Sequence, residues 1–215
     1  MKENLIEAQY DISKKSRLHK FYERNKLLIY SVLFLLIFSL VSINFYYSKV
    51  QNKRVLLAEN FVQSKILLGK GEKEEALNLL KEIVYSNDST YSTLSFYLIL
   101  NQKLMDNNFE ILEIFDHILK NNKFENETRN LLIYKKLLVS SNFAEESIIL
   151  EIAKPVLNSE NYWKPHALLL IGNYYFSKKQ FIKAKDFYSQ ILLINNLDSY
   201  LYNEAKLQLS FIGNE

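Results

Sequence analysis

The longest apolar run of the chain separates a short charged N-terminal segment from a long segment of regularly spaced apolar residues. No charged residue occurs over 27–48 (LLIYSVLFLLIFSLVSINFYYS), where 14 of the 22 side chains are Leu, Ile, Val or Phe. A helix of this length spans about 33 Å, close to the thickness of a bilayer's hydrocarbon core. The alternative is a buried core helix, but those are shorter and carry polar residues on one face. The run therefore predicts a membrane-spanning helix.

The flanking charges predict the orientation of this helix. The 15 residues before the run hold six Lys and Arg, and the 15 after it hold three, so the N-terminus is expected in the cytoplasm. The run is longer than the apolar core of a signal peptide and lacks a small-residue cleavage site, so we expect it to remain uncleaved. The predicted divisions are a basic cytoplasmic tail at 1–26, a transmembrane helix at 27–48 and an extracytoplasmic domain at 49–215.

Residues 49–215 show apolar positions at three- and four-residue spacing in runs of roughly 12 to 18 residues, separated by short polar turns, as helices do. No stretch alternates with period two. The region holds all four glycines and both prolines of the chain, and few breakers also favour helices. The pattern predicts an all-α domain without a sheet, with nine helices near 50–69, 72–86, 91–105, 108–120, 125–140, 143–157, 163–177, 180–194 and 199–212.

Evenly sized helices in pairs suggest a repeat, and 165–194 is the clearest one. Leu168, Ile171, Gly172 and Tyr175 fit the first helix of a tetratricopeptide repeat, and Phe181, Ala184 and Tyr188 fit the second. Gly172 and Ala184 are expected to face each other where the helices cross, and Asn196 stands in place of the usual closing proline. Ala76, Leu112, Glu146 and Ala184 are 36, 34 and 38 residues apart, near the 34-residue repeat. This spacing predicts four helix pairs, with 199–212 as a capping helix. The predicted packing residues are Ala76, Gly172, Tyr175, Ala184 and Tyr188.

At this level the chain resembles the bacterial ancillary SecYEG translocon subunit family. The resemblance rests on the basic tail with Phe21-Tyr22, the single anchor helix, the stretches Lys154 to Leu157 and Tyr162 to Ala167, and the repeat from Gly172 to Ala184. It implies a scaffold beside the export channel that binds translocon components, periplasmic chaperones or newly exported polypeptides. These motifs are packing motifs, so they indicate architecture better than activity.

The sequence offers little chemistry for an enzyme. The chain has no Cys, and its three histidines, His19, His117 and His166, are far apart in sequence. No metal-binding His motif, phosphate-binding Gly loop or nucleophile elbow occurs. Residues 49–215 carry 20 basic and 20 acidic side chains, so no basic excess favours nucleic acid. We therefore expect no catalytic site, metal, cofactor or small-molecule substrate, and we expect Lys178, Lys179, Lys183 and Lys185 to form a solvated helix face.

A binding surface is the remaining expectation. In repeats of this type the first helix of each pair lines a groove, which selects Phe61, Lys65, Leu68, His166, Leu169, Asn173 and Phe176. Asn173 occupies the position where peptide-binding relatives hold a ligand backbone, although an ordinary surface Asn fits equally simply. The many aromatic residues suit a protein interface, or else the core. The sequence leaves open whether the groove or the opposite face binds. The alternative function is a structural assembly factor for another envelope complex, in outer-membrane insertion, respiratory-complex maturation or division.

Overall fold

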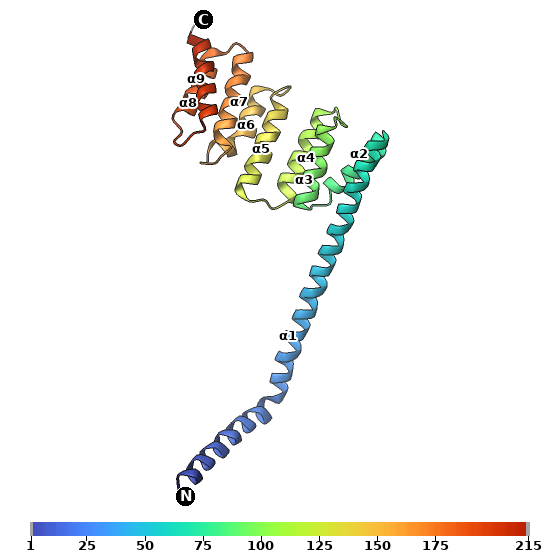
Figure 1. Cartoon of the computed structure of the whole chain (residues 1–215), viewed down its shortest axis with the longest axis vertical. Helices are drawn as coiled ribbons and strands as arrows, with labels where there is room; N and C mark the ends of the chain where they lie inside the picture. The colour runs from blue at the N-terminus through green and yellow to red at the C-terminus, as the bar shows by residue number, and fades with distance from the viewer. Residues whose placement is uncertain (1, 214–215) are drawn as a thin grey trace. The chain divides into compact units, whose positions relative to one another are not determined.

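The computed structural model describes residues 2–213, with side chains from His19 onward. All regular secondary structure in this part of the chain is helical. This part contains nine helices and no strand. The chain divides into two compact units, Met1–Leu56 and Leu57–Glu215, which we call the N-terminal unit and the C-terminal unit (Figure 1). The expected all-α composition is confirmed.

The first helix, α1 (Lys2–Lys70), is far longer than the sequence pattern predicts. The absence of Gly and Pro between the apolar run and the first helix of the outer domain predicts one continuous rod, and no break falls at 48–49. The tail was expected as a separate element, yet no break falls at 26–27 either. The physical reason is that the first glycine is Gly69 and no proline precedes Pro155, so nothing interrupts the hydrogen-bond ladder. Within α1, His19–Lys70 includes a stretch long and apolar enough to cross a membrane, and that stretch is exposed throughout.

The remaining helices follow the predicted ranges to within a few residues and lie in the C-terminal unit (Figure 1). Each packs against the next in sequence, and α7 also contacts both α5 and α9. Their bounds are α2 (Lys73–Val84), α3 (Ser89–Asn101), α4 (Asn108–Asn121), α5 (Asn126–Ser140), α6 (Glu146–Leu157), α7 (Lys164–Ser177), α8 (Phe181–Leu192) and α9 (Ser199–Gly213).

Polar side chains set several of these helix ends. The Asp88 carboxylate accepts the backbone N–H groups of Thr90 and Tyr91, each at 3.0 Å, which starts α3 two residues earlier than expected. Asn196, the residue in place of a closing proline, has φ +54°. Proline cannot adopt a positive φ, whereas Asn tolerates the left-handed region, so this turn requires a residue of its type.

The C-terminal unit has two hydrophobic cores. We call the first the α2–α5 core; it includes Leu80, Phe96, Phe115 and Leu132. The second, the α5–α9 core, includes Leu137, Ile171, Ala184, Tyr188 and Ala205. α5 contributes side chains to both, and the partly buried Leu119 of α4 packs against both. The cores are therefore adjacent along the helix order.

The predicted packing residues are all buried, although the repeat is less regular than its spacing suggests. Ala76, Ala184 and Tyr188 are fully inaccessible, Tyr175 is 2% exposed and Gly172 is buried. Two other positions of the predicted spacing differ, because Leu112 is half-buried and Glu146 carries an ion pair at the surface. The burial that the predicted register requires is thus found in α2, α7 and α8, and the repeat itself stays a prediction.

Gly172 lies against an aromatic ring. A Cβ added at Gly172 would lie 2.4 Å from Cε1 of Tyr188 and 2.7 Å from its Cδ1, so the atoms closest to this glycine belong to Tyr188 rather than to Ala184. The Tyr188 ring is fully buried, and its hydroxyl donates a hydrogen bond to Oδ1 of Asn173 at 2.7 Å. The ring is therefore held on both sides and has little room to shift.

We expect Gly172→Ala to destabilise the protein despite the better helix propensity of alanine. The propensity gain is about 0.8–1.0 kcal/mol, whereas overpacking a dense core costs about 1–3 kcal/mol. Thermal unfolding of the full-length protein in detergent measures the difference. Gly69→Ala is the matched control, because nothing lies within 4 Å of the added Cβ, and it should be neutral or slightly stabilising. Equal stability of the two variants would contradict the close approach of Tyr188.

Candidate binding surfaces

Three of the seven residues predicted to line a groove pack against a core, and the three are divided between the two cores. Lys65 and Asn173 are exposed, and the other five are half-buried. Phe61 packs against the α2–α5 core, and its ring centroid lies 6.3 Å from that of Tyr91. Leu169 and Phe176 pack against the α5–α9 core. Much of the apolar surface of these side chains is used within the fold, and their role in a common groove stays a prediction.

Asn173 has a structural partner of its own. Its Oδ1 accepts the hydrogen bond from the Tyr188 hydroxyl at 2.7 Å, so the side-chain carbonyl is already occupied. Burial of Tyr188 and the negative charge of Glu204 raise the pKa of that phenol, which keeps it protonated as a donor. The Nδ2 donors of Asn173 and the second lone pair of its Oδ1 are left for a ligand, and the bond to Tyr188 gives the residue a positioning role within the fold.

Three rings surround that of His166, and the four together form a patch that we call the aromatic cluster. It consists of Tyr134 from α5, Tyr162 and Trp163 before α7, and His166 in the first turns of α7. Tyr134 and Trp163 are stacked with centroids 5.4 Å apart, and His166 lies between 5.2 and 5.9 Å from each of the other three. Tyr162 is 64% exposed, so the cluster presents an aromatic edge to the surface.

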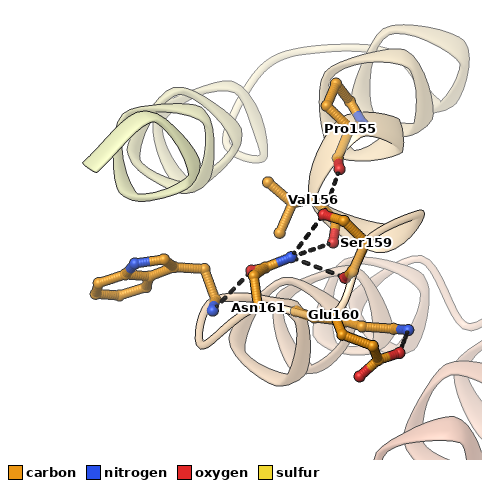
Figure 2. A network of polar contacts seen from close by, with 7 residues as sticks. Pro155, Val156, Ser159, Glu160 and Asn161 are labelled. Carbon is orange, nitrogen blue, oxygen red and sulfur yellow. Dashed lines mark hydrogen bonds and ion pairs between the residues drawn. The ribbon is translucent and has the colours of Figure 1, made fainter. Parts of the chain in front are cut away.

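A polar network fixes the loop that carries this cluster. Figure 2 shows Asn161 between the end of α6 and the start of α7, where its Nδ2 donates to the carbonyl oxygens of Val156 at 2.8 Å and Ser159 at 2.9 Å. Its Oδ1 accepts the backbone N–H of Trp163 at 2.9 Å. One amide thereby satisfies a terminal carbonyl of α6 and positions the chain entering α7.

An open cleft of about 660 Å³ lies between α4, α5 and α6, and we call it the α4–α6 cleft. None of the seven predicted groove residues lines it. Its apolar wall and its charged rim come from three helices: Leu112, Asp116, Leu119 and Lys120 of α4, Arg129, Ile133 and Lys136 of α5, and Ile148, Glu151, Ile152 and Pro155 of α6.

Lys178, Lys179, Lys183 and Lys185 are exposed, as expected of a solvated helix face. Lys183 also makes an ion pair with another helix. Its Nζ donates to both carboxylate oxygens of Glu146 on α6, at 2.7 and 2.9 Å, and lies 5.1 Å from the Tyr175 ring centroid. Burial of Tyr175 and its hydrogen bond with Glu146 raise the pKa of this phenol to about 12. The three side chains link α6, α7 and α8, and a tertiary ion pair of this kind is not visible in the spacing of charges along one helix.

The aromatic residues divide between core and surface. Of ten aromatic residues considered for an interface, Phe96 and Tyr175 are buried, five are half-buried, and Tyr162, Tyr200 and Tyr202 are exposed. The five half-buried residues are Tyr91, Tyr97, Tyr134, Trp163 and Tyr174. Some of these aromatic residues therefore belong to the core, and others are exposed and available for a protein interface.

Among the described residues no group of three or more His, Asp or Glu side chains is arranged to hold a metal ion. Two of the histidines make structural contacts: His117 Nε2 lies 2.9 Å from Oδ1 of Asn87, and His166 belongs to the aromatic cluster. Comparison of the chain with protein-family models, curated proteins and solved structures finds no match.

Proposed function

We propose that this protein is a membrane-anchored helical scaffold that binds other proteins outside the cytoplasm. The observation that carries the proposal is the exposed, uncharged stretch of α1, which is joined in one chain to a helical unit with an aromatic cluster and an open cleft. The excess of Lys and Arg before the apolar run supports a cytoplasmic N-terminus and a C-terminal unit on the opposite side.

A solenoid of tetratricopeptide-like pairs is the architecture that we propose for the C-terminal unit. The contacts of α7 with α5 and α9 support it, because stacked pairs bring the first helix of each pair against the first helix of the next. The buried residues of α7 and α8 at the repeat positions support the same arrangement, with α9 as the cap.

For the partners, we propose components of the protein-export channel, periplasmic chaperones or newly exported chains. This assignment rests on the resemblance to the ancillary SecYEG translocon subunit family. The rival is a structural subunit of another envelope complex, for which an anchored helical scaffold is equally suited. The two differ in whether binding depends on newly made protein.

The topology is tested by extraction and by protease access. If α1 crosses the membrane once over 27–48, the protein should stay in the membrane at alkaline pH, and protease added to spheroplasts should remove the C-terminal unit. A reporter that is active only outside the cytoplasm should be active when fused to the C-terminus. Protection of the C-terminal unit in spheroplasts would exclude the proposed orientation.

The partner class is tested by photocrosslinking in living cells. A photoreactive phenylalanine at Tyr162 or Phe176 should capture export-channel subunits, a folding factor or new chains, and capture of new chains should fall when synthesis stops. The same probe at Lys185, an exposed residue of α8, is the matched control. Capture of one stable envelope complex that persists without synthesis would favour the rival.

A further inference from the structure

The α4–α6 cleft combines an apolar wall with charges that are not all paired within the fold. Ile133 is 6% exposed at its base, and Ile148 on α6 is 42% exposed at its edge. Lys136 is paired with Asp116, with 2.7 Å between Nζ and Oδ1. Lys120 and Arg129 have no ion pair in the described part of the chain, so this side of the cleft keeps an excess of positive charge.

Arg129 already binds a hydrogen-bond acceptor on the α4 and α5 side of the cleft. Its guanidinium donates to the backbone carbonyl of Leu119 at 2.9 Å, near the end of α4. A guanidinium has five N–H donors, so the others remain for an oxygen-bearing ligand. Lys120 lies one residue further along α4 and lines the same cleft. Together they favour a carboxylate over any cationic group.

The opposite wall offers a backbone acceptor. Pro155 lies inside α6 and has no N–H, so the carbonyl of Glu151 lacks the donor that a helix normally supplies four residues later. Ile148, Glu151, Ile152 and Pro155 are spaced as one face of α6, and all four line the cleft. An extended peptide carries free backbone N–H groups that match such an acceptor, whereas a helical peptide has already used its own.

We propose that the α4–α6 cleft binds an extended, unfolded peptide segment that carries apolar side chains beside at least one acidic side chain. The apolar residues lie against Ile133 and Ile148, and the carboxylate lies at Lys120 and Arg129. An anionic lipid would use the same cations, but its phosphodiester has no N–H donor for the Glu151 carbonyl, whereas an extended peptide has one. This inference deepens the proposed scaffold role and rests on it, because it gives the chemistry of the segment that the scaffold takes.

The test measures binding of two synthetic peptides to the full-length protein in detergent by fluorescence anisotropy. The peptides share their leucine positions and carry either glutamate or lysine between them. The glutamate peptide should bind the more tightly, and its Kd should rise with salt. Lys120→Glu and Ile148→Asp should each weaken that binding about tenfold, because each replaces a side chain that contacts the peptide with a negative charge.

Lys185→Glu and Ile182→Asp are matched controls on α8, where Ile182 is 82% exposed, and they should leave binding unchanged. Equal binding of both peptides, or equal effects of cleft and control variants, would overturn the proposal. Binding of neither peptide would overturn the proposal as well, and binding of phosphatidylglycerol vesicles that both cleft variants lose would then assign the cleft to lipid. Crosslinks in cells that survive both cleft substitutions would overturn the cleft assignment while leaving the scaffold function standing.

Discussion

Ala184→Arg should unfold the α7–α8 region at a much lower temperature than the unmodified protein. Ala184 is fully inaccessible in the α5–α9 core. A larger side chain there costs about 1–3 kcal/mol for overpacking, and burying an unpaired guanidinium adds to that cost. A loss of about 3 kcal/mol lowers the Tm by roughly 6–12 °C in a chain of this size. Trp163, the single tryptophan, packs against the same core and reports its unfolding by fluorescence.

The matched control places the same new arginine at an exposed position of the same helix. Ile182 is 82% exposed on α8, so Ile182→Arg should change the Tm by no more than a degree or two. Lys183→Ala is unsuitable as a neutral control because it removes the ion pair with Glu146, although a partly exposed pair contributes only about 0–1 kcal/mol. Similar effects of Ala184→Arg and Ile182→Arg would show that the α8 register is wrong.

Phe115→Ala should cause the largest loss of stability in the α2–α5 core. The rings of Phe96 and Phe115 meet edge to face with centroids 4.6 Å apart, and both side chains are fully buried. Truncating a buried phenylalanine leaves a cavity and typically costs about 3–5 kcal/mol. Chemical denaturation of the full-length protein in detergent, followed by far-UV circular dichroism, measures this loss.

Phe109→Ala is the control for that experiment, since Phe109 lies on the same helix and is 81% exposed. It should unfold at nearly the same denaturant concentration as the unmodified protein. If both phenylalanines proved equally important, Phe109 would have to be covered in solution, and the description of α4 as a helix with one buried face would fail.

The sequence predicts the helices well because their ends depend on nearby residues. α4 and α5 begin and end within one residue of the expected ranges. The start of α6 is wrong by three residues. Ser141 and Asn142 donate side-chain hydrogen bonds to the carbonyls of Leu138 and Val139, so they terminate α5 instead of opening the next helix. The spacing of residues along the chain does not show whether Ser and Asn here end one helix or begin the next.

The binding surfaces were harder to predict because they depend on contacts between helices. The aromatic cluster needs Tyr134, which lies about one helix pair away from Trp163 in sequence, and repeat spacing says nothing about ring stacking between them. The cleft was missed for the same reason. One local signal was present: Pro155 inside a predicted helix marks a free carbonyl at Glu151, and the spacing of Ile148, Ile152 and Pro155 marks the face that carries it.

Because Leu119 and α5 contribute to both cores, the C-terminal unit can unfold locally in two steps. Leu132 packs into the α2–α5 core and Leu137 into the α5–α9 core, so α5 is the helix that the two cores share. A chain built this way can lose protection from hydrogen exchange in two steps, with the amides of α2–α4 and those of α7–α9 forming separate groups. A small movement of one core relative to the other at α5 would widen or narrow the α4–α6 cleft without unfolding either core.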